Sequence, residues 1–519
     1  MIARVLSGAL LGIDAYLVEV EVDVASRGLP KFHIVGLPEE AIRESKERVK
    51  SAIVNTGHKF PSCRLTVNLA PANQKKVGTA FDLPIALGIL AGMNDWDREI
   101  LKRFLFVGEL SLDGQVRPIR GTISLALLAR SRGLQGIAVP EPNAREAALV
   151  RDLEVRPVAS LAVAAQFLAG ALELPTQQAE TADFGNAEEP AGPDLAEVTG
   201  QAVPKRALEI AAAGGHNLLF FGPPGAGKTL LARRLPSILP PMTLEESLET
   251  TRIHSIAGLL PPDAPLIRRR PFRAPHHHIS NAGLIGGGLV PRPGEVSLAH
   301  HGVLFLDELT EFRRQVLEQL RQPLEEGFLT VARSGVSVRF PASVLFVGAM
   351  NPCPCGYLGA PDRPCTCTDF QVTQYRGRLS GPLLDRIDLH VEVARVPYRD
   401  LACLSSPGVS SLRIRERVLE ARRIQRERLN GSPAGCNARM GTGEVACHCP
   451  LDGQGRRLLE TAFEKLRLSA RAYHRILKVS RTIADLEGSE GIRTGHVAEA
   501  IQYRILDRDR YPSHQRAAG

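Results

Sequence analysis

The pattern of apolar and polar residues in the first third of the chain alternates between two periods. Short runs such as LTVNLAP, FLFVGELSL and GIAVP predict strands, whereas EEAIRESKERVKSAIVNTG and NAREAALV carry the three-to-four-residue spacing of helices. Strands that alternate with helices are typical of an α/β domain. We therefore predict a first α/β domain over residues 1–172.

A polar segment that is poor in large apolar side chains, Pro175 to Asp194, predicts an interdomain linker over residues 173–193. The α/β pattern then resumes, with VPKRALEIAAAGG as a helix and NLLFFG as a buried strand. It predicts a second α/β domain over residues 194–398 and a helical domain over residues 399–519. Amphipathic helices are expected in the last domain at 412–429, 455–466, 470–486 and 494–505.

Composition is that of an ordinary soluble multidomain protein. The 519 residues are 44% hydrophobic and 23% charged, and no apolar run reaches the roughly 18 residues that cross a bilayer. The N-terminus lacks the cleavage site of a signal peptide, so we expect a cytoplasmic protein with no membrane partner. The net charge of +8 permits a polyanionic partner, although solubility alone also explains it.

A phosphate-binding loop joins the strand NLLFF to a following helix. GPPGAGKT matches G-x-x-x-x-G-K-[ST] in the strand-to-helix setting that this motif requires. Backbone N–H groups surround the phosphates of ATP, Lys228 reaches the β- and γ-phosphates, and Thr229 offers a hydroxyl to Mg²⁺. The expected nucleotide ligands in the loop are Gly222, Pro223, Pro224, Gly225, Ala226, Gly227, Lys228 and Thr229.

Two other predicted strands end in polar residues. GVLFL is followed by Asp307, a candidate Mg²⁺ ligand, and by Glu308, which can polarise an attacking water. The alternative, that both acids only cap the next helix, is disfavoured because the strand is apolar and the acids are paired. SVLFVGAM ends at Asn351, and Arg386 and Arg471 offer cations for phosphoryl transfer. Spacing alone assigns no role to either arginine.

These motifs together resemble the YifB/ComM family of magnesium-chelatase-like AAA+ ATPases over nearly the whole chain. The segments that carry the resemblance are GPPGAGKT, FRAPHHHIS, PGEVSLAHHGVLFLDEL, AMNPCPCG, LSGPLLDRIDLHVEV and AYHRILKVSRTIADLEG. The resemblance implies a ring-forming ATPase, and for ComM a hexameric helicase that promotes branch migration of DNA in natural transformation. It makes Asn351 the sensor-1 residue, Arg386 an arginine finger acting in trans, and Arg471 the sensor-2 arginine, with Arg475 as a fallback.

The same resemblance implies DNA contacts. An insertion that projects toward the central pore would carry Arg268, Arg269, Arg270 and Arg273, although a solvated basic loop is the alternative. GFLTVARSGVSVRFPAS predicts a hairpin that turns at Ser-Gly, and by resemblance its Arg333 contacts DNA. The histidines 276–278 are expected to pack or stack, since three neighbours on a regular strand or helix cannot all face one ion.

The N-terminal domain resembles the proteolytic domain of Lon. The segments VGELSLDGQVRPIRG and KKVGTAFDLPIALGIL carry the likeness. They place Ala80 where Lon has its catalytic serine and Ile123 where Lon has its lysine. Neither side chain can act as nucleophile or base, so we expect no protease activity. A scaffold, an assembly collar or a DNA-contacting surface are the roles left for this domain.

Four cysteines form two Cys-x-Cys pairs directly after Asn351. The turn-rich segment between the pairs allows all four thiols to meet on one structural Zn²⁺. Reduced, unliganded thiols and an iron–sulfur cluster are the alternatives, and a disulfide is disfavoured in the cytoplasm. The predicted ligands are Cys353, Cys355, Cys365 and Cys367.

We thus predict an α/β multidomain ATPase that uses ATP and Mg²⁺, assembles as a hexameric ring and acts on single-stranded or branched DNA, with recombination proteins as candidate partners. Two alternatives stay open. One is a chelatase-type motor that remodels a protein, and the other is a non-motor regulatory protein that only binds ATP. The intact acids and Arg386 disfavour the second of these.

Overall fold

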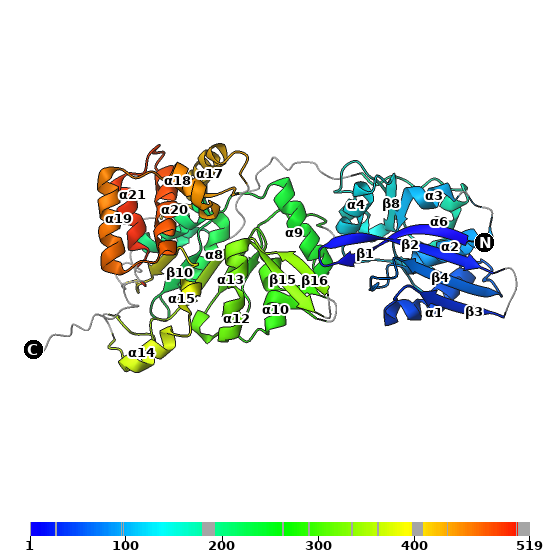
Figure 1. The fold of residues 1–519 in the computed structure, drawn as a ribbon, viewed down its shortest axis with the longest axis horizontal. Helices are drawn as coiled ribbons and strands as arrows, with labels where there is room; N and C mark the ends of the chain where they lie inside the picture. The colour runs from blue at the N-terminus through cyan, green and yellow to red at the C-terminus, as the bar shows by residue number, and fades with distance from the viewer. Residues whose placement is uncertain are drawn as a thin grey trace, which may run out of the picture.

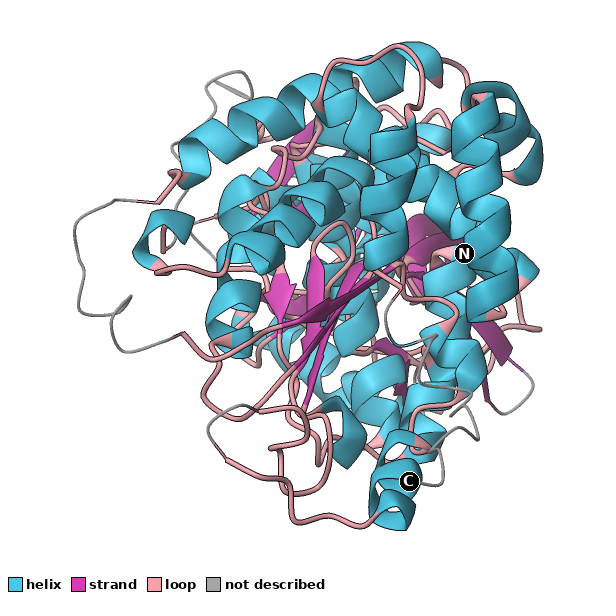
Figure 2. Ribbon diagram, turned by 90° about the vertical axis from the view of Figure 1, so that its left-hand side faces the viewer, coloured by secondary structure: helices cyan, strands magenta, loops and turns pink. Residues whose placement is uncertain are grey.

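The computed structural model describes residues 2–25, 29–94, 96, 98–178, 193–261, 264–288, 291–333, 336–360, 363–396, 408–432, 434–504 and 506. Most of the predicted linker lies outside these residues. In Figure 1 an N-terminal α/β part lies at one end of the long axis, a central α/β part lies beside it, and a helical part packs on the far end of the central part. Figure 2, viewed from the helical end, shows helices in front of the central strands.

The N-terminal part is built on two main sheets, beside the short two-stranded sheet β6-β7. The larger has the order β1-β2-β4-β3, and the smaller, parallel one has the order β5-β8-β9. Helix α2 is apolar on all sides and lies buried against β1 and β2, as expected for a helix without a solvent face. The elements are β1 (Ile2–Leu11), β2 (Asp14–Val24), β3 (Lys31–Val35), α1 (Glu40–Asn55), β4 (Arg64–Ala70), α2 (Asp82–Met93), α3 (Glu99–Arg103), β5 (Phe104–Phe106), β6 (Glu109–Leu110), β7 (Val116–Arg117), α4 (Thr122–Ser131), β8 (Gly136–Pro140), α5 (Ala144–Ala147), β9 (Glu154–Val158) and α6 (Leu161–Leu168).

The two positions matched to the Lon dyad carry no reactive group. Ile123 is completely buried in α4, and Ala80 lies just before α2. The neighbouring Ser124 is also buried, and its hydroxyl donates to the carbonyl of Ile13 at 2.6 Å. These side chains therefore belong to the packing of the domain.

The central part contains a parallel sheet of order β11-β14-β17-β10-β18. Strands β14 and β17 are buried at every residue, as expected for a parallel sheet that is covered on both faces. Phe220, Phe305 and Val347 face α7, α8 and the helical part, while their neighbours face a second core. The elements are α7 (Ala202–Gly214), β10 (Leu218–Phe221), α8 (Lys228–Ile238), α9 (Leu244–Ala257), β11 (Phe272–Arg273), α10 (Asn281–Ile285), β12 (Gly286–Gly287), β13 (Arg292–Pro293), α11 (Glu295–Leu298), β14 (Val303–Leu306), α12 (Arg314–Gln319), α13 (Arg321–Glu326), β15 (Phe328–Arg333), β16 (Val336–Pro341), β17 (Leu345–Met350), α14 (Asp369–Arg376), α15 (Gly381–Leu384) and β18 (Leu389–Glu392).

The helical part follows the predicted amphipathic segments closely. It comprises α17 (Ser411–Arg428), α18 (Thr442–His448), α19 (Gly453–Leu466), α20 (Ala470–Leu486) and α21 (Thr494–Gln502). Helix α18 was not predicted, because its seven residues are too short for a periodic pattern. Arg475 of α20 pairs with the buried Asp388 just before β18, so an ion pair joins this part to the sheet.

Helix α9 connects the central part to the N-terminal part. Arg252 donates to the carbonyl of Ile13 at 3.1 Å and to Asp14 Oδ1 at 2.8 Å. On the same helix, Ser255 Oγ donates to Glu146 Oε1 at 2.5 Å and accepts from the N–H of Gly121 at 2.9 Å. The two parts are therefore joined by specific polar contacts.

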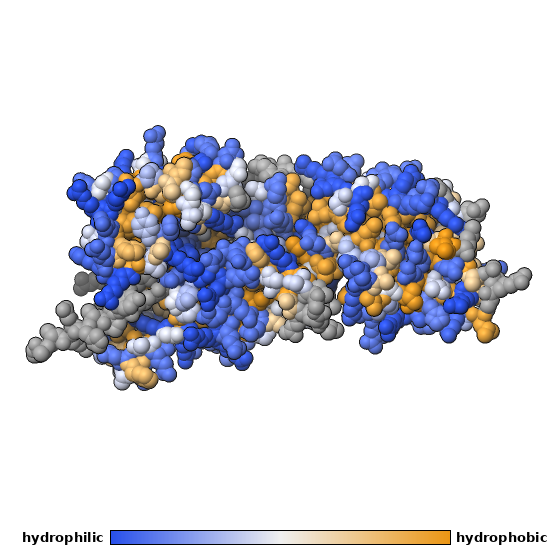
Figure 3. All heavy atoms as spheres, in the orientation of Figure 1, coloured by the Kyte–Doolittle hydropathy of each residue, from blue (hydrophilic) through white to orange (hydrophobic). Residues whose placement is uncertain are grey.

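Polar and apolar side chains are interspersed over the face that Figure 3 shows. Among the described residues, no helix combines the length and the apolar character that crossing a membrane requires.

Candidate functional site

The phosphate-binding loop runs from the carboxyl end of β10 to the first turn of α8. Strand β10 lies between β17 and the edge strand β18, so the loop leaves an interior strand of the sheet. A Cβ on Gly222 would lie 2.2 Å from the carbonyl oxygen of Val393, and Gly227 has a φ of 95°. Both positions therefore require glycine, one for close backbone approach and the other for its left-handed conformation.

Lys228 occupies the centre of the loop. Its Nζ donates to the carbonyls of Gly222 at 2.6 Å and Pro223 at 2.9 Å and to Asn351 Oδ1 at 3.1 Å. Burial lowers the pKa of Lys228 to about 8, against the opposing effect of Asp307 and Glu308. The ammonium group is thus held by oxygens that phosphate oxygens can replace.

Thr229 and Asp307 form the oxygen pair that a Mg²⁺ site needs. Thr229 Oγ1 donates to Asp307 Oδ2 at 2.6 Å, across 78 residues of sequence. Asp307 directly follows β14, and Asn351 directly follows β17. Hydroxyl and carboxylate oxygens are the donors that Mg²⁺ prefers, so these residues fit the ion. The structure therefore brings four of the predicted site residues to one edge of the sheet.

Glu308 lies beside this group with its carboxylate exposed. Its backbone is left-handed, with a φ of 50°, and its N–H donates to Asp307 Oδ1 at 2.9 Å. Its Oε2 lies 3.4 Å from Nδ1 of His277, a contact that was not expected from the sequence. The only available signal for this contact was the unusual triple histidine itself.

The three histidines stack as expected, but they also converge. The rings of His276 and His278 are stacked with centroids 5.1 Å apart, and one ring nitrogen from each of the three histidines lies within 4.8 Å of the others. The argument that three neighbouring imidazoles cannot face one ion applies to a regular strand or helix, whereas this segment contains a turn. Through His277, which contacts Glu308, this cluster borders the candidate site.

Arg386 and Arg471 meet on a carboxylate of their own chain. Arg386 is buried, pairs with Glu325 at the end of α13 and donates to the carbonyl of Pro382 at 2.8 Å. Arg471 Nη2 lies 3.6 Å from the other oxygen of Glu325. Among the described residues, neither guanidinium contacts the phosphate-binding loop, and Nε of Arg386 is buried without a hydrogen-bond partner.

The arginines predicted to contact DNA differ in exposure and in their partners within the chain. Arg268 and Arg269 are exposed, whereas Arg273 is paired with Glu295 through two hydrogen bonds. Arg270 is held by three carbonyl oxygens and by Glu246, so its N–H groups are committed within the chain. Residues 334 and 335 at the hairpin turn and the side chain of Arg333 lie outside what the structure describes.

The four predicted cysteine ligands form one cluster. The Sγ atoms of Cys353 and Cys355 are 3.4 Å apart, and both lie within 3.6 Å of Cys365 Sγ. The Sγ of Cys367 accepts from the N–H of Cys355 at 3.3 Å. All four are free thiols, since these separations far exceed the roughly 2.05 Å of a disulfide. Among the described residues, this is the one cluster of four metal-ligating side chains.

The cysteine cluster lies against the phosphate-binding loop. A Cβ on Gly356, between the two cysteine pairs, would come within 2.8 Å of Pro224 Cδ. Cys353 follows Asn351 by two residues. Any interaction that orders the cysteine segment therefore also supports the phosphate-binding loop and the end of β17.

The phosphate-binding loop, the two acids after β14 and Asn351 after β17 lie at one edge of the parallel sheet. This arrangement defines a P-loop ATPase site. Three family models match the chain: "Magnesium chelatase, subunit ChlI" over residues 194–401, "Subunit ChlI of Mg-chelatase" over residues 20–143, and "Magnesium chelatase, subunit ChlI C-terminal" over residues 408–504. The protein therefore belongs to the class of magnesium-chelatase-like AAA+ ATPases.

Relatives that match over the full length show which family within this class the chain belongs to. The chain is 46% identical over 511 residues to the competence protein ComM of Haemophilus influenzae, with 98% of each chain covered. It is 42% identical over 514 residues to the protein YifB of Salmonella typhimurium, again with 98% of each covered. The magnesium-chelatase 38 kDa subunit of Cereibacter sphaeroides is 26% identical over an alignment of 263 positions that covers 43% of this chain and 70% of that subunit. The chain belongs to the YifB/ComM family of magnesium-chelatase-like ATPases.

Proposed function

We propose that this protein is an ATP-driven motor that assembles as a ring, hexameric by resemblance, and moves along single-stranded or branched DNA as a branch-migration helicase in natural transformation or recombination. The observation that carries the proposal is the convergence of Lys228, Thr229, Asp307 and Asn351 at one edge of the sheet. The assignment of DNA as the client rests on the full-length similarity to a protein named for competence.

In the proposed reaction, the phosphates of ATP replace the carbonyl oxygens that now hold Lys228. Mg²⁺ bound by Thr229 and Asp307 would neutralise charge on the β- and γ-phosphates. Glu308 accepts a proton from the water that attacks the γ-phosphorus, the bond to the β–γ bridging oxygen breaks, and ADP leaves with that oxygen. Asn351 orients the water or a γ-phosphate oxygen through its amide.

Arg386 and Arg471 act, in this proposal, on the nucleotide of a neighbouring subunit. Both side chains contact Glu325 of α13, and among the described residues neither contacts the phosphate-binding loop of its own chain. A neighbour's γ-phosphate competes with Glu325 for them, and a guanidinium binds phosphate oxygens as a bidentate partner. The site is then complete only between two copies.

The DNA contacts are proposed at the exposed Arg268 and Arg269 and at Arg333. The test is ATP turnover by the full chain with no DNA, with single-stranded DNA and with forked duplex. We expect DNA to stimulate turnover and forked duplex to be unwound, with both activities lost in Glu308→Gln. The double variant Arg268→Ala/Arg269→Ala should lose the stimulation and keep basal turnover, whereas the matched control Arg413→Ala should behave as the parent.

We also propose a structural Zn²⁺ on the four cysteines. A tetrahedral ion with Zn–S bonds of about 2.3 Å separates its ligand sulfurs by about 3.8 Å, close to the separations of 3.4–3.6 Å in the cluster. Elemental analysis should find about one zinc per chain, and Cys355→Ser should lose the metal and lower the melting temperature. Zinc-free protein, with the same melting temperature in Cys355→Ser, would exclude the metal. Cys63→Ser, outside the cluster, is the matched control.

A second candidate is a chelatase-type motor whose client is a protein. It is favoured by the match of all three family models to magnesium chelatase subunits. If no DNA structure stimulates ATP turnover, the chelatase-type motor that acts on a protein becomes the favoured function. Either motor is distinguished from a non-motor regulatory protein by ATP hydrolysis itself, and neither is expected to be a protease, given Ala80 and Ile123.

A further inference from the structure

A cavity of about 230 Å³ lies where the helical part meets the amino ends of the parallel strands. Its lower wall includes Gly215 before β10, His301 before β14 and Ser343 before β17, and its upper wall is formed by α17 and the turn around Cys436. The phosphate-binding loop follows the carboxyl end of β10. The cavity and the ATP site are therefore at opposite edges of the same sheet.

The wall of this cavity is strongly cationic. Among the described residues that line it, the single carboxylate is Glu246, and that group is already paired with one arginine at 2.7 Å and lies 3.6 Å from Nδ1 of His301. The lining arginines, which come from both sides of the cavity, are Arg270, Arg422, Arg426 and Arg439.

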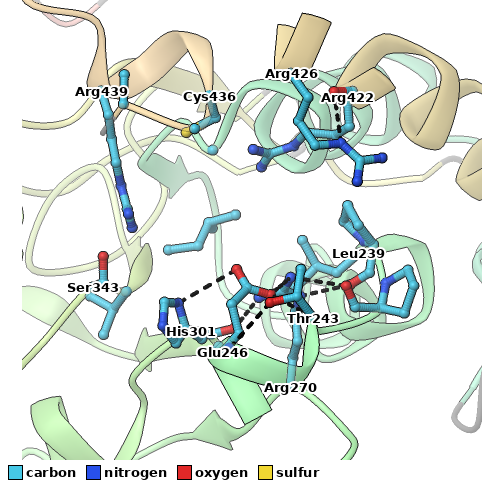
Figure 4. A pocket seen from close by; sticks show the side chains of 18 of the residues that line it. Leu239, Thr243, Glu246, Arg270, His301, Ser343, Arg422, Arg426, Cys436 and Arg439 are labelled. Carbon is cyan, nitrogen blue, oxygen red and sulfur yellow. Dashed lines mark hydrogen bonds and ion pairs between the residues drawn. The ribbon is translucent and has the colours of Figure 1, made fainter. Parts of the chain in front are cut away.

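No carboxylate among the described residues pairs with the three arginines of the upper wall. Arg422 donates from Nε and Nη2 to the carbonyl of Ala212, which fixes its guanidinium without balancing its charge. Within the described part of the chain, Arg426 donates only to the carbonyl of Arg422, at 3.4 Å. The guanidinium of Arg439 has no hydrogen-bond or ion-pair partner in the described part of the chain, and Figure 4 shows it reaching into the cavity toward Ser343.

The titratable groups around the cavity respond to this excess of positive charge. Burial raises the pKa of the Cys436 thiol, but Arg422 and Arg439 outweigh it, so the pKa lies below its ordinary value. Burial lowers the pKa of Arg270, Glu246 opposes this, and Arg422 and Arg439 lower it further. A second negative charge in the cavity would relieve the repulsion among the arginines.

We propose that this cavity binds a phosphate group. Guanidinium forks match the oxygens of a phosphate, and several arginines can share one tetrahedral anion that offers four oxygens. The volume is below the roughly 300–1,000 Å³ of sites for drug-sized ligands, so one or two phosphate groups fit better than a whole nucleotide. The phosphate has two sources, a small phosphorylated compound or the backbone of a nucleic acid. The proposal does not depend on the ATPase function.

The test uses the full chain carrying Lys228→Ala, so that binding at the phosphate-binding loop does not contribute to the calorimetric signal. Inorganic pyrophosphate and a short single-stranded oligonucleotide are titrated separately by calorimetry at one fixed salt concentration. We expect at least one probe to bind, and Arg439→Ala to weaken it by about tenfold or more, because a charge-assisted hydrogen bond is lost. Arg439→Lys should recover part of the affinity.

Controls separate the cavity from general surface charge. Arg413→Ala, at the exposed start of α17 and outside the cavity, should bind as the parent does. Arg426→Ala, a second exposed cavity arginine, should weaken the same probe as Arg439→Ala. If the two variants weaken the affinity for pyrophosphate alone, the ligand is a small phosphate compound. If they weaken the affinity for the oligonucleotide alone, the cavity binds a nucleic-acid backbone. If neither probe binds, or Arg439→Ala changes neither affinity, the proposal is wrong.

Discussion

Lys228 offers the sharpest test of the nucleotide site, because its charge is predicted to change within an accessible pH range. Its pKa in the chain without nucleotide is lowered to about 8, mainly by burial. Bound phosphates favour the charged form and raise that pKa, so nucleotide binding above pH 8 takes up a proton. Affinity is therefore fully present below the pKa of the free protein and falls as the pH rises through it.

The magnitude follows from the fraction of neutral lysine. With a pKa near 8, about one lysine in ten is neutral at pH 7 and about nine in ten at pH 9, so the dissociation constant of an ATP analogue should rise about tenfold between them. Calorimetry in two buffers of different ionisation enthalpy should show proton uptake of about 0.1 per nucleotide at pH 7 and about 0.9 at pH 9.

The control is Lys228→Arg, which stays charged throughout and should bind with no dependence on pH over this range. Equal affinities at pH 7 and pH 9 in the parent, without proton uptake, would refute the reasoning. The same slope in Lys228→Arg would also refute it, because the titrating group would then lie elsewhere.

Other predictions concern the remaining site residues and the link between sheet and helical part. Glu308→Gln should lower turnover by about 100-fold or more and leave nucleotide affinity within about threefold, since only proton acceptance is lost; a turnover near that of the parent would contradict its role. His277→Ala should change turnover and leave nucleotide affinity unchanged, because His277 contacts the Glu308 carboxylate; parallel rate measurements and binding titrations check this. Asp388→Ala leaves Arg475 without its buried partner and should cost about 3–5 kcal/mol in chemical denaturation; a loss below about 1 kcal/mol would contradict the importance of this ion pair.

The parts of the site that follow a buried strand could be predicted from sequence. Asp307 and Asn351 each directly follow an apolar run, and parallel strands bring their carboxyl ends to one edge. The loop around Lys228 is specified by local glycines, so its place before α8 also follows from sequence.

Contacts between distant segments could not be predicted in this way. The pairing of Arg386 with Glu325 spans 61 residues and depends on how α13 packs beside the end of α15. The family resemblance made Arg270 a candidate DNA contact, but the fold surrounds it with carbonyl oxygens and Glu246. The meeting of His277 and Glu308 depends on an irregular turn, for which periodicity carries no signal.

The cavity lined by Arg422 and Arg439 also lay beyond sequence analysis. Its walls come from seven separate segments, and each arginine in isolation is an ordinary charged residue on a polar surface. Only the packing of α17 above the amino ends of the strands brings the charges together.

The measurement that tests the central claim most directly is ATP turnover in a mixture of two inactive variants. Arg386→Ala chains keep Lys228 and Glu308, and Glu308→Gln chains keep Arg386, so a pocket shared between one copy of each variant is complete. If adjacent copies build each site together, each variant alone is inactive and an equal mixture recovers up to about a quarter of the parent turnover, from random pairing at the interfaces. A mixture that stays inactive, or Arg386→Ala chains that turn over ATP at the parent rate on their own, would contradict the account.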